Sequence, residues 1–157
     1  MSADMPRHVL LLLSGPNLNL LGTRQPEIYG TDTLQDHVDA ARRAAIERDW
    51  DLEHRQSNHE GDLVDAVHAA IGRVEAIVIN PGALTHYGWS LHDALAAFGG
   101  PIVELHLSEP RKRERWRHLS VVEPLASARV AGEGGAGYPR AVALAIEAAT
   151  GAGSAAG

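Results

Sequence analysis

Residues 76–80 read Ala-Ile-Val-Ile-Asn, an apolar run that ends on a polar residue and is followed at once by Pro81 and Gly82. A short run of this kind, bounded by turn-forming residues, is typical of a strand that is buried on both faces. Residues 8–14, His-Val-Leu-Leu-Leu-Leu-Ser, have the same form and are followed by Gly15. Strands buried on both faces belong to parallel sheets that are covered by helices on each side. The two runs therefore predict an α/β domain.

Further strand patterns alternate with helical patterns along the rest of the chain. Parallel strands joined through helices form βαβ units, and about five strands predict a flavodoxin-like, doubly wound five-stranded parallel sheet in a single domain. Polar and apolar side chains alternate in 51–57, which suits an edge strand, and Thr31 or Asp32 is the expected cap of the first long helix. The remaining strands are predicted at 51–57, 102–108 and 129–132, and the helices at 33–49, 60–72, 89–97 and 138–150.

Composition and charge exclude several classes of function. The chain of 157 residues has no cysteine, which excludes disulfides and thiolate nucleophiles, and its single lysine, Lys112, leaves one candidate for Schiff-base chemistry. A formal net charge of -6 argues against broad binding to nucleic acid or anionic membranes. No apolar run reaches the roughly 18 residues of a membrane span, and a cytoplasmic location is expected. Residues 1–7 and 151–157 are expected to be flexible, which leaves 8–150 as the domain.

Ligands of doubly wound sheets bind beyond the carboxyl ends of the strands, so residues that follow the predicted strands are the first candidates for a site. These residues are Ser-Gly-Pro-Asn at 14–17, Asn-Pro-Gly at 80–82 and His-Leu-Ser at 106–108. The first group opens a loop over 15–30, a length that in a compact domain favours a functional role. No Gly-Lys pair closes this loop, so it is not a Walker A motif.

Two pairs of side chains are candidates for proton transfer. Glu104 and His106 stand two residues apart on a predicted strand and therefore share one face. A carboxylate there would stabilise the imidazolium and orient the ring, as a general acid requires, although a structural ion pair is the alternative. Arg24 and Tyr29 share the long loop, where the guanidinium would favour the phenolate and make Tyr29 a usable base. Loop side chains that merely pack or face solvent are the alternative for this pair.

Polar groups beside the central strand carry a weaker signal. Asn80 ends that strand, and its amide can orient a carboxylate or a hydroxyl. His86, His92 and Asp93 follow it, but their spacing matches no metal-ligand motif. No metal is therefore expected.

Two further segments have unusual composition. Residues 111–117 hold five of the 14 basic residues, and Trp116 is the only aromatic residue among them. This composition favours an anionic substrate or a neighbouring subunit over nucleic acid, and a solvated helix turn is the alternative. Residues 132–137 match Gly-x-Gly-x-x-Gly, but no βαβ unit follows them. This second segment predicts a tight turn and not a dinucleotide site.

Taken together, these segments resemble the type II 3-dehydroquinate dehydratases, enzymes of the shikimate pathway. The resemblance runs in order along nearly the whole chain, and the first, third and fourth of its stretches are specific to that family. The matching stretches are 15–30 (GPNLNLLGTRQPEIYG), 55–61 (RQSNHEG), 79–86 (INPGALTH), 103–108 (VELHLS), 113–120 (RERWRHLS) and the glycine-rich turn before Tyr138.

The resemblance implies a flavodoxin-like subunit in a homododecamer, a tetramer of trimers. It implies an anti elimination of water from 3-dehydroquinate with no metal, cofactor or covalent intermediate. In this mechanism Tyr29, activated by Arg24, removes a proton from carbon 2, and a water held by Asn17 stabilises the enolate. His106, supported by Glu104, then protonates the departing hydroxyl. The implied binding residues are Asn80 and the amides of Leu107 and Ser108 for the carboxylate, His86 and Arg117 for ring hydroxyls, Arg113 in a closing lid, and Asp93 from a neighbouring subunit.

The sequence departs from the family pattern at a few positions. Ser14 stands where the family usually has Asn, and Tyr87-Gly88-Trp89 replaces a usual Thr-Ser-Val. Glu109 replaces an expected Asn after the His-Leu-Ser stretch. A carboxylate at that place would weaken the binding of an anion unless an arginine pairs with it.

Two other functions are alternatives to the biosynthetic reaction. The same dehydration also serves quinate catabolism, and the sequence does not separate the two roles. A non-catalytic flavodoxin-like module, such as a response regulator, would need an acidic pocket after the first strand, where this chain has Ser-Gly-Pro-Asn at 14–17.

Overall fold

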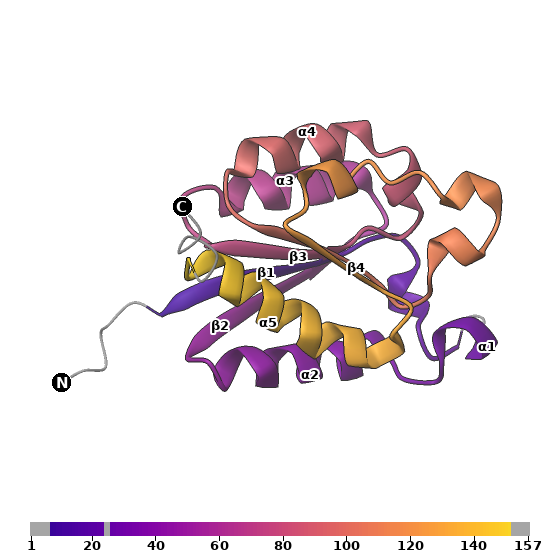
Figure 1. The fold of residues 1–157 in the computed structure, drawn as a ribbon, viewed down its shortest axis with the longest axis horizontal. Helices are drawn as coiled ribbons and strands as arrows, with labels where there is room; N and C mark the ends of the chain where they lie inside the picture. Colours follow the sequence, from indigo (N-terminus) through magenta and orange to yellow (C-terminus); the bar gives the residue numbers. More distant parts are fainter. Residues whose placement is uncertain (1–6, 24–25, 152–157) are drawn as a thin grey trace.

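The computed structural model describes residues 7–23 and 26–151, except for the side chains of residues 28 and 29. Five strands form one sheet in the order β2-β1-β3-β4-β5, and every neighbouring pair is parallel (Figure 1). The predicted five-stranded parallel sheet and the edge position of the second strand are confirmed. Apart from Arg7 and Gly151, the chain ends predicted to be flexible lie outside the described residues. The strands are β1 His8–Ser14, β2 Trp50–Gln56, β3 Ala76–Asn80, β4 Ile102–His106 and β5 Ala128–Ala131.

Helices cover both faces of the sheet, α2 and α5 on one side and α3 and α4 on the other (Figure 1). In β1 the side chains of Leu10 and Leu12 pack with the first pair of helices, and those of Leu11 and Leu13 pack with the second. This alternation is the two-residue period of a strand, and it explains why β1 is apolar throughout. No helix in the described residues is long and apolar enough to cross a membrane. The helices are α1 Pro26–Tyr29, α2 Leu34–Ile46, α3 Glu60–Ala70, α4 Trp89–Phe98 and α5 Gly137–Ala149.

The start of α2 corrects the sequence prediction. The cap is Thr33, not Thr31 or Asp32, because the Thr33 side chain accepts from the Asp36 amide while the Asp36 carboxylate accepts from the Thr33 amide. This reciprocal arrangement satisfies two helix-end donors at once, which an earlier cap would not do. Hydrogen bonds from Thr33 also hold the pKa of Asp36 below its ordinary value. The helix ends at Ile46, earlier than predicted.

The loops that follow β1 and β3 touch each other at the carboxyl edge of the sheet. The Gly15 amide donates to the Asn80 carbonyl at 2.8 Å. A Cβ atom on Gly15 would lie 2.2 Å from the carbonyl oxygen of Pro81, which is far inside van der Waals contact. Gly82 has a φ of +61°, a conformation that favours glycine. The two glycines therefore allow the two loops to approach each other closely at this edge of the sheet.

Gly15→Ala is expected to lower the free energy of unfolding by about 3 kcal/mol, because the added methyl group must displace backbone atoms. Urea denaturation measures the change. Gly61→Ala is the matched control, since a Cβ atom there has nothing within 4 Å and Gly61 lies in α3. The control is expected to be neutral or slightly stabilising. Equal stability of the two variants would contradict the close approach of the loops.

Candidate active site

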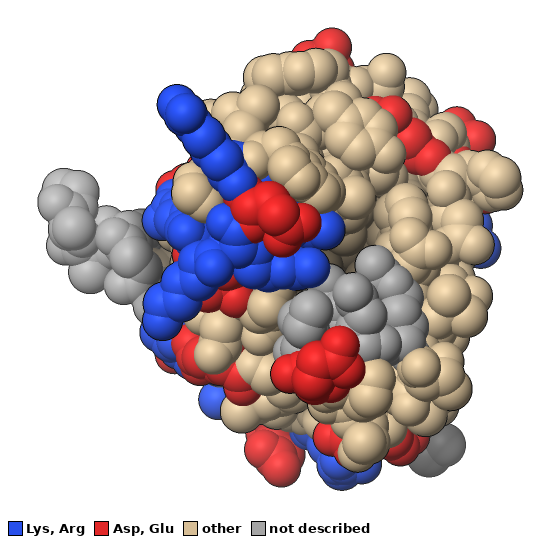
Figure 2. Space-filling model, turned by 90° about the vertical axis from the view of Figure 1, so that its right-hand side faces the viewer, with Lys and Arg blue, Asp and Glu red and all other residues tan. Residues whose placement is uncertain are grey.

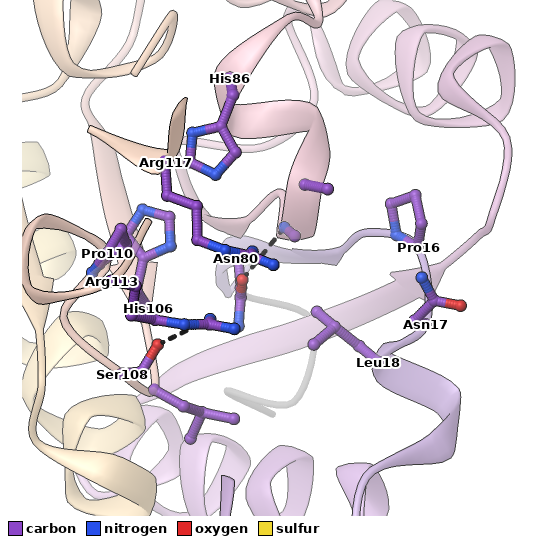
Figure 3. Close-up of a pocket in the computed structure, with 13 residues that line it drawn as sticks. Pro16, Asn17, Leu18, Asn80, His86, His106, Ser108, Pro110, Arg113 and Arg117 are labelled. Carbon is purple, nitrogen blue, oxygen red and sulfur yellow. Dashed lines mark hydrogen bonds between the residues drawn. The ribbon is translucent and has the colours of Figure 1, made fainter. Parts of the chain in front are cut away.

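A hollow lies at the carboxyl edge of the sheet, between the loops after β1, β3 and β4 (Figure 3). Arg113 and Arg117 extend toward Asn80 from one side, and Asn17 and Leu18 lie opposite His106 (Figure 3). The expectation that the strand ends carry the site agrees with this arrangement. The predicted site residues that line the hollow are Asn17, Asn80, His86, His106, Leu107, Ser108, Arg113 and Arg117. Pro16 and Gly82, from the stretches 14–17 and 80–82 that follow the strands, also line it. Sequence reasoning had given no role to the remaining lining residues, which are Leu18, Ala83 and Pro110.

Glu104 and His106 form a buried pair, as their spacing predicted. The Nε2 atom of His106 lies 2.6 Å from Glu104 Oε2, and the two residues are 6% and 0% exposed. The hydroxyl of Ser120 donates to the same carboxylate oxygen at 2.8 Å. Ser120 has no role in the sequence prediction, although it lies in the matching stretch 113–120. With Nε2–H directed at the carboxylate, Nδ1 is the ring nitrogen left for a ligand.

The ionisation of Glu104 depends on these contacts. Burial alone raises the pKa of Glu104, but the hydrogen bonds from His106 and Ser120 and the charge of His106 outweigh it. The net effect is a pKa below the ordinary value, so Glu104 is an anion at neutral pH. A buried carboxylate stabilises the protonated form of a hydrogen-bonded imidazole. The anionic Glu104 therefore holds the ring of His106 in place beside the hollow.

His86 presents a neutral ring to the same hollow. Its Nδ1 lies 2.7 Å from the Leu119 carbonyl, and its ring meets the edge of Trp116 at a centroid distance of 5.4 Å. Burial lowers the pKa of His86, and the positive charges of His106 and Arg117 lower it further against the opposing effect of the Leu119 carbonyl. Donation from Nδ1 to the carbonyl leaves Nε2 as an acceptor. His86 can therefore accept a hydrogen bond from a ligand hydroxyl.

The basic segment 111–117 divides between the hollow and the surface. Figure 2 shows its face of the molecule, where basic side chains gather with acidic ones among them. Arg113 donates to the Ser108 hydroxyl at 3.4 Å, and Arg117 donates to Glu114 at 3.1 Å. The Arg117 guanidinium also lies 4.0 Å from the centre of the Trp116 ring. Arg111 instead pairs with Glu123, outside the hollow.

Polar side chains at the end of β2 and just after it hold the loop that carries Asn17. Asn17 has a left-handed backbone, with φ of 69°. Its backbone amide donates to the side-chain oxygen of Asn58 at 2.9 Å. The Gln56 amide group donates to the Gly15 carbonyl at 3.2 Å and to Asn58. Neither Gln56 nor Asn58 was assigned a role from sequence, although both lie in the matching stretch 55–61. They fix the backbone of the loop at the wall of the site.

Glu109 is paired with an arginine. Two nitrogens of Arg129 donate to its two carboxylate oxygens, each at 3.3 Å. The condition under which Glu109 would not weaken anion binding is therefore met. Arg129 lies in β5, and a sequence alone does not reveal that β5 runs beside the loop after β4.

The other predicted features lie as follows. Asp93 is exposed on α4 and is outside the hollow of its own chain. Tyr29 ends the short helix α1, and Arg24 lies outside the described residues. The glycine-rich stretch 132–137 forms a tight turn before α5, as predicted, where Gly135 approaches the ring of His37.

Ser14, one of the departures from the family pattern, contacts a partly buried histidine. Its hydroxyl lies 2.9 Å from Nε2 of His54. Burial lowers the pKa of His54 from 6.5 to about 4, and the charge of Arg42 adds to this effect. His54 is therefore neutral in the folded protein near neutral pH.

The folded protein is expected to become less stable in acid because of His54. Between pH 6.5 and about 4 the unfolded chain binds a proton at His54 that the folded chain does not bind. The free energy of unfolding is therefore unaffected by His54 above pH 6.5 and falls as the pH drops through this window. Urea denaturation at pH 7.5 and pH 4.5 measures the loss, which should be smaller in His54→Gln. The exposed His68 provides the control variant His68→Gln, whose pH dependence should equal that of the parent; equal dependence in all three proteins would contradict the assignment.

The similarity of this chain to known proteins extends over both the sheet and the candidate site. The family model for class II dehydroquinases matches residues 8–146. A 3-dehydroquinate dehydratase of Herpetosiphon aurantiacus is 52% identical over 129 residues, which are 82% of this chain and 90% of that relative. Catabolic 3-dehydroquinase 2 of Aspergillus flavus is 48% identical over 138 residues, 88% of this chain and 92% of that relative. The crystal structure of the type II dehydroquinase from Butyrivibrio crossotus has a TM-score of 0.86 and 37% identity, and covers 89% of this chain and 98% of that one.

These similarities agree with the fold and the site geometry of the chain. A doubly wound parallel sheet with a buried Glu–His pair at its carboxyl edge defines a flavodoxin-like α/β protein with a candidate active site. The chain belongs to the class II dehydroquinase family and is a lyase of that family. The resemblance read from the sequence is confirmed.

Proposed function

We propose that the enzyme catalyses the reversible dehydration of 3-dehydroquinate to 3-dehydroshikimate, an anti elimination through an enolate. The observation that carries this proposal is the buried Glu104–His106 pair, which borders a hollow walled by Arg113 and Arg117. A proton donor beside arginines suits a substrate that bears a carboxylate and must lose a hydroxyl. Membership of the class II dehydroquinase family supports the same reaction.

The first half of the reaction needs a base and a site for negative charge. Tyr29, activated by Arg24, takes the proton from carbon 2, where the neighbouring ketone makes it acidic. The electron pair of the broken C–H bond moves onto the ketone oxygen and forms the enolate. Asn17 holds a water that donates to this oxygen. The hydrogen bond from the backbone amide of Asn17 to Asn58 keeps Asn17 in place.

The second half of the reaction needs an acid. The enolate returns its electron pair, a carbon–carbon double bond forms, and the bond to the hydroxyl breaks. His106 gives its proton to the departing oxygen, which leaves as water. Tyr29 has gained one proton and His106 has lost one, so exchange with solvent restores the enzyme. The hydrogen bond of 2.6 Å to Glu104 orients the ring and stabilises its charged form between turnovers.

The other groups of the hollow bind the substrate. Asn80 and the backbone amides of Leu107 and Ser108 hold the carboxylate. His86 and Arg117 bind ring hydroxyls, which agrees with an accepting Nε2 on His86. Arg113 lies close to Ser108 and closes over the bound substrate as part of a lid.

We also propose that the enzyme is a homododecamer, a tetramer of trimers, in which Asp93 reaches the site of a neighbouring subunit. Asp93 is exposed on α4 and does not line the hollow of its own chain. Tyr87 and Trp89 lie beside it in sequence and are 60% and 56% exposed. Exposed aromatic side chains of this size favour a subunit interface.

A biosynthetic role in the cytoplasmic shikimate pathway is the proposed physiological function. Its alternative is quinate catabolism, and one of the similar proteins is named as a catabolic enzyme. Deletion of the gene separates the two roles. A requirement for aromatic amino acids supports biosynthesis, whereas loss of growth on quinate alone supports catabolism.

The direct test is turnover of 3-dehydroquinate by the purified enzyme, followed by the growing absorbance of the enone product. Steady formation of 3-dehydroshikimate is expected, and no formation of enone would overturn the proposed function. Borohydride added during turnover should leave the enzyme active, because the mechanism has no Schiff base. Labelling of Lys112 under these conditions would overturn the non-covalent mechanism.

A further inference from the structure

The ion pair between Glu109 and Arg129 lies next to Glu104, the partner of the proposed acid. The two side chains are 19% and 20% exposed and are joined by two parallel hydrogen bonds of 3.3 Å. Glu109 follows Ser108, whose carbonyl accepts from Gly132 at 3.1 Å. A two-pronged arginine–carboxylate pair of this kind has a defined geometry as well as a favourable energy. It ties the loop after β4 to β5.

Arg129 is also the register partner of Glu104. The two residues face each other across the parallel strands β4 and β5, so their Cα atoms are about 5 Å apart. Glu104 Oε1 and Arg129 Nε are both buried, and neither has a hydrogen-bond partner among the described residues. One of these atoms accepts and the other donates. The positive charge of Arg129 also contributes to keeping the pKa of Glu104 low.

We propose that Arg129 is a positioning residue for the Glu104–His106 pair, and that Glu109 anchors Arg129 and offsets its charge. The inference rests on the proposed function for its catalytic meaning but not for its electrostatics. The arginine competes with His106 for the negative charge of Glu104, and Glu109 moderates that competition. Two residues that do not line the hollow thus control the charge beside the Glu104–His106 pair.

Opposite effects follow for the two partners. In Arg129→Gln, the carboxylates of Glu104 and Glu109 lose a compensating charge, so the apparent pKa of His106 rises. In Glu109→Gln, the full charge of Arg129 faces the pair, so the apparent pKa of His106 falls. Each change is expected to be about half a pH unit. The other charged groups near the pair are unchanged in both variants; they are His86, Arg111, Arg113 and Arg117.

NMR titration of the imidazole C–H signals in histidine-labelled enzyme measures these shifts without any substrate. The signal of His106 is assigned by its absence in His106→Asn. The expected result is opposite shifts in Arg129→Gln and Glu109→Gln, with a value near the parent in the double variant. Arg73→Gln is the matched control, because it breaks the exposed pair with Glu53 at the amino edge of the sheet. Shifts in the same direction, or no shift, would overturn the inference.

Kinetics give a second readout. The alkaline limb of the kcat profile, which reports the acid in the enzyme–substrate complex, should move in the same directions as the NMR midpoints. Arg129→Gln should raise KM about fivefold, because unpaired Glu109 repels the substrate carboxylate, and the double variant should restore KM. Merely structural damage would not give opposite shifts and a rescue. Opposite NMR shifts in an enzyme with no dehydratase activity would leave the inference standing and refute the proposed function, whereas turnover with unshifted midpoints would do the reverse.

Discussion

His106→Asn is expected to lower kcat for dehydration of 3-dehydroquinate by about 10³-fold, the usual contribution of a positioned general acid. Asparagine keeps a polar side chain of similar reach but has no proton to give to a departing hydroxyl. The pocket that binds the substrate is otherwise intact, so KM should change much less than kcat. Initial rates measured across a range of substrate concentrations separate the two effects.

The matched control for this prediction is His68→Asn. His68 is exposed on α3 and lies outside the hollow, so kcat should equal that of the parent. Circular dichroism and urea denaturation establish that His106→Asn is folded, since the loss of a buried partner for Glu104 also costs stability. A kcat within tenfold of the parent in a folded His106→Asn enzyme would show that another group supplies the proton.

Tyr29→Phe is expected to lower kcat by at least about 10³-fold with little loss of folding. Phenylalanine has no ionisable hydroxyl, so the proton on carbon 2 has no base of comparable reach. The helix α1, which ends at Tyr29, has only four residues, so the substitution should leave the sheet and its flanking helices in place. Turnover under saturating substrate gives kcat, and a thermal melt checks the fold.

The exposed Tyr87 provides the control for this second prediction. Tyr87→Phe removes the same phenolic hydroxyl from a residue that is 60% exposed and outside the hollow. The kcat of this variant should therefore equal that of the parent. If Tyr29→Phe keeps more than a tenth of the parent activity, the base is a different group. That outcome would leave the dehydration itself intact and would change only the assignment of the first step.

The strands were the most predictable part of the fold. β1 and β3 have the bounds that their apolar runs predict, because a strand buried on both faces must be apolar throughout. The ends of the helices were less predictable. The start of α2 depends on which residue forms the reciprocal hydrogen bonds of a cap, and three candidates stand together at 31–33.

The place of the hollow was also predictable, because side chains that follow parallel strands meet at one edge of the sheet. Glu104 and His106 were predicted to share a face, and they do so within 2.6 Å. The partners that hold these residues were not predictable. Ser120 reaches Glu104 from 16 residues further along the chain, and no local pattern marks such a contact.

The amino-acid sequence by itself determined the parallel sheet, the family and the set of chemical groups at the strand ends. These properties follow from the period of the strands and from residues close together in the chain. Only the tertiary structure decided how charges are paired, because pairing depends on strand order and register. Glu109 read from the sequence is an obstacle to an anionic substrate, whereas in the folded protein it meets Arg129 from the neighbouring strand β5. The register that places Arg129 opposite Glu104 also brings this ion pair next to the partner of the proposed acid, His106.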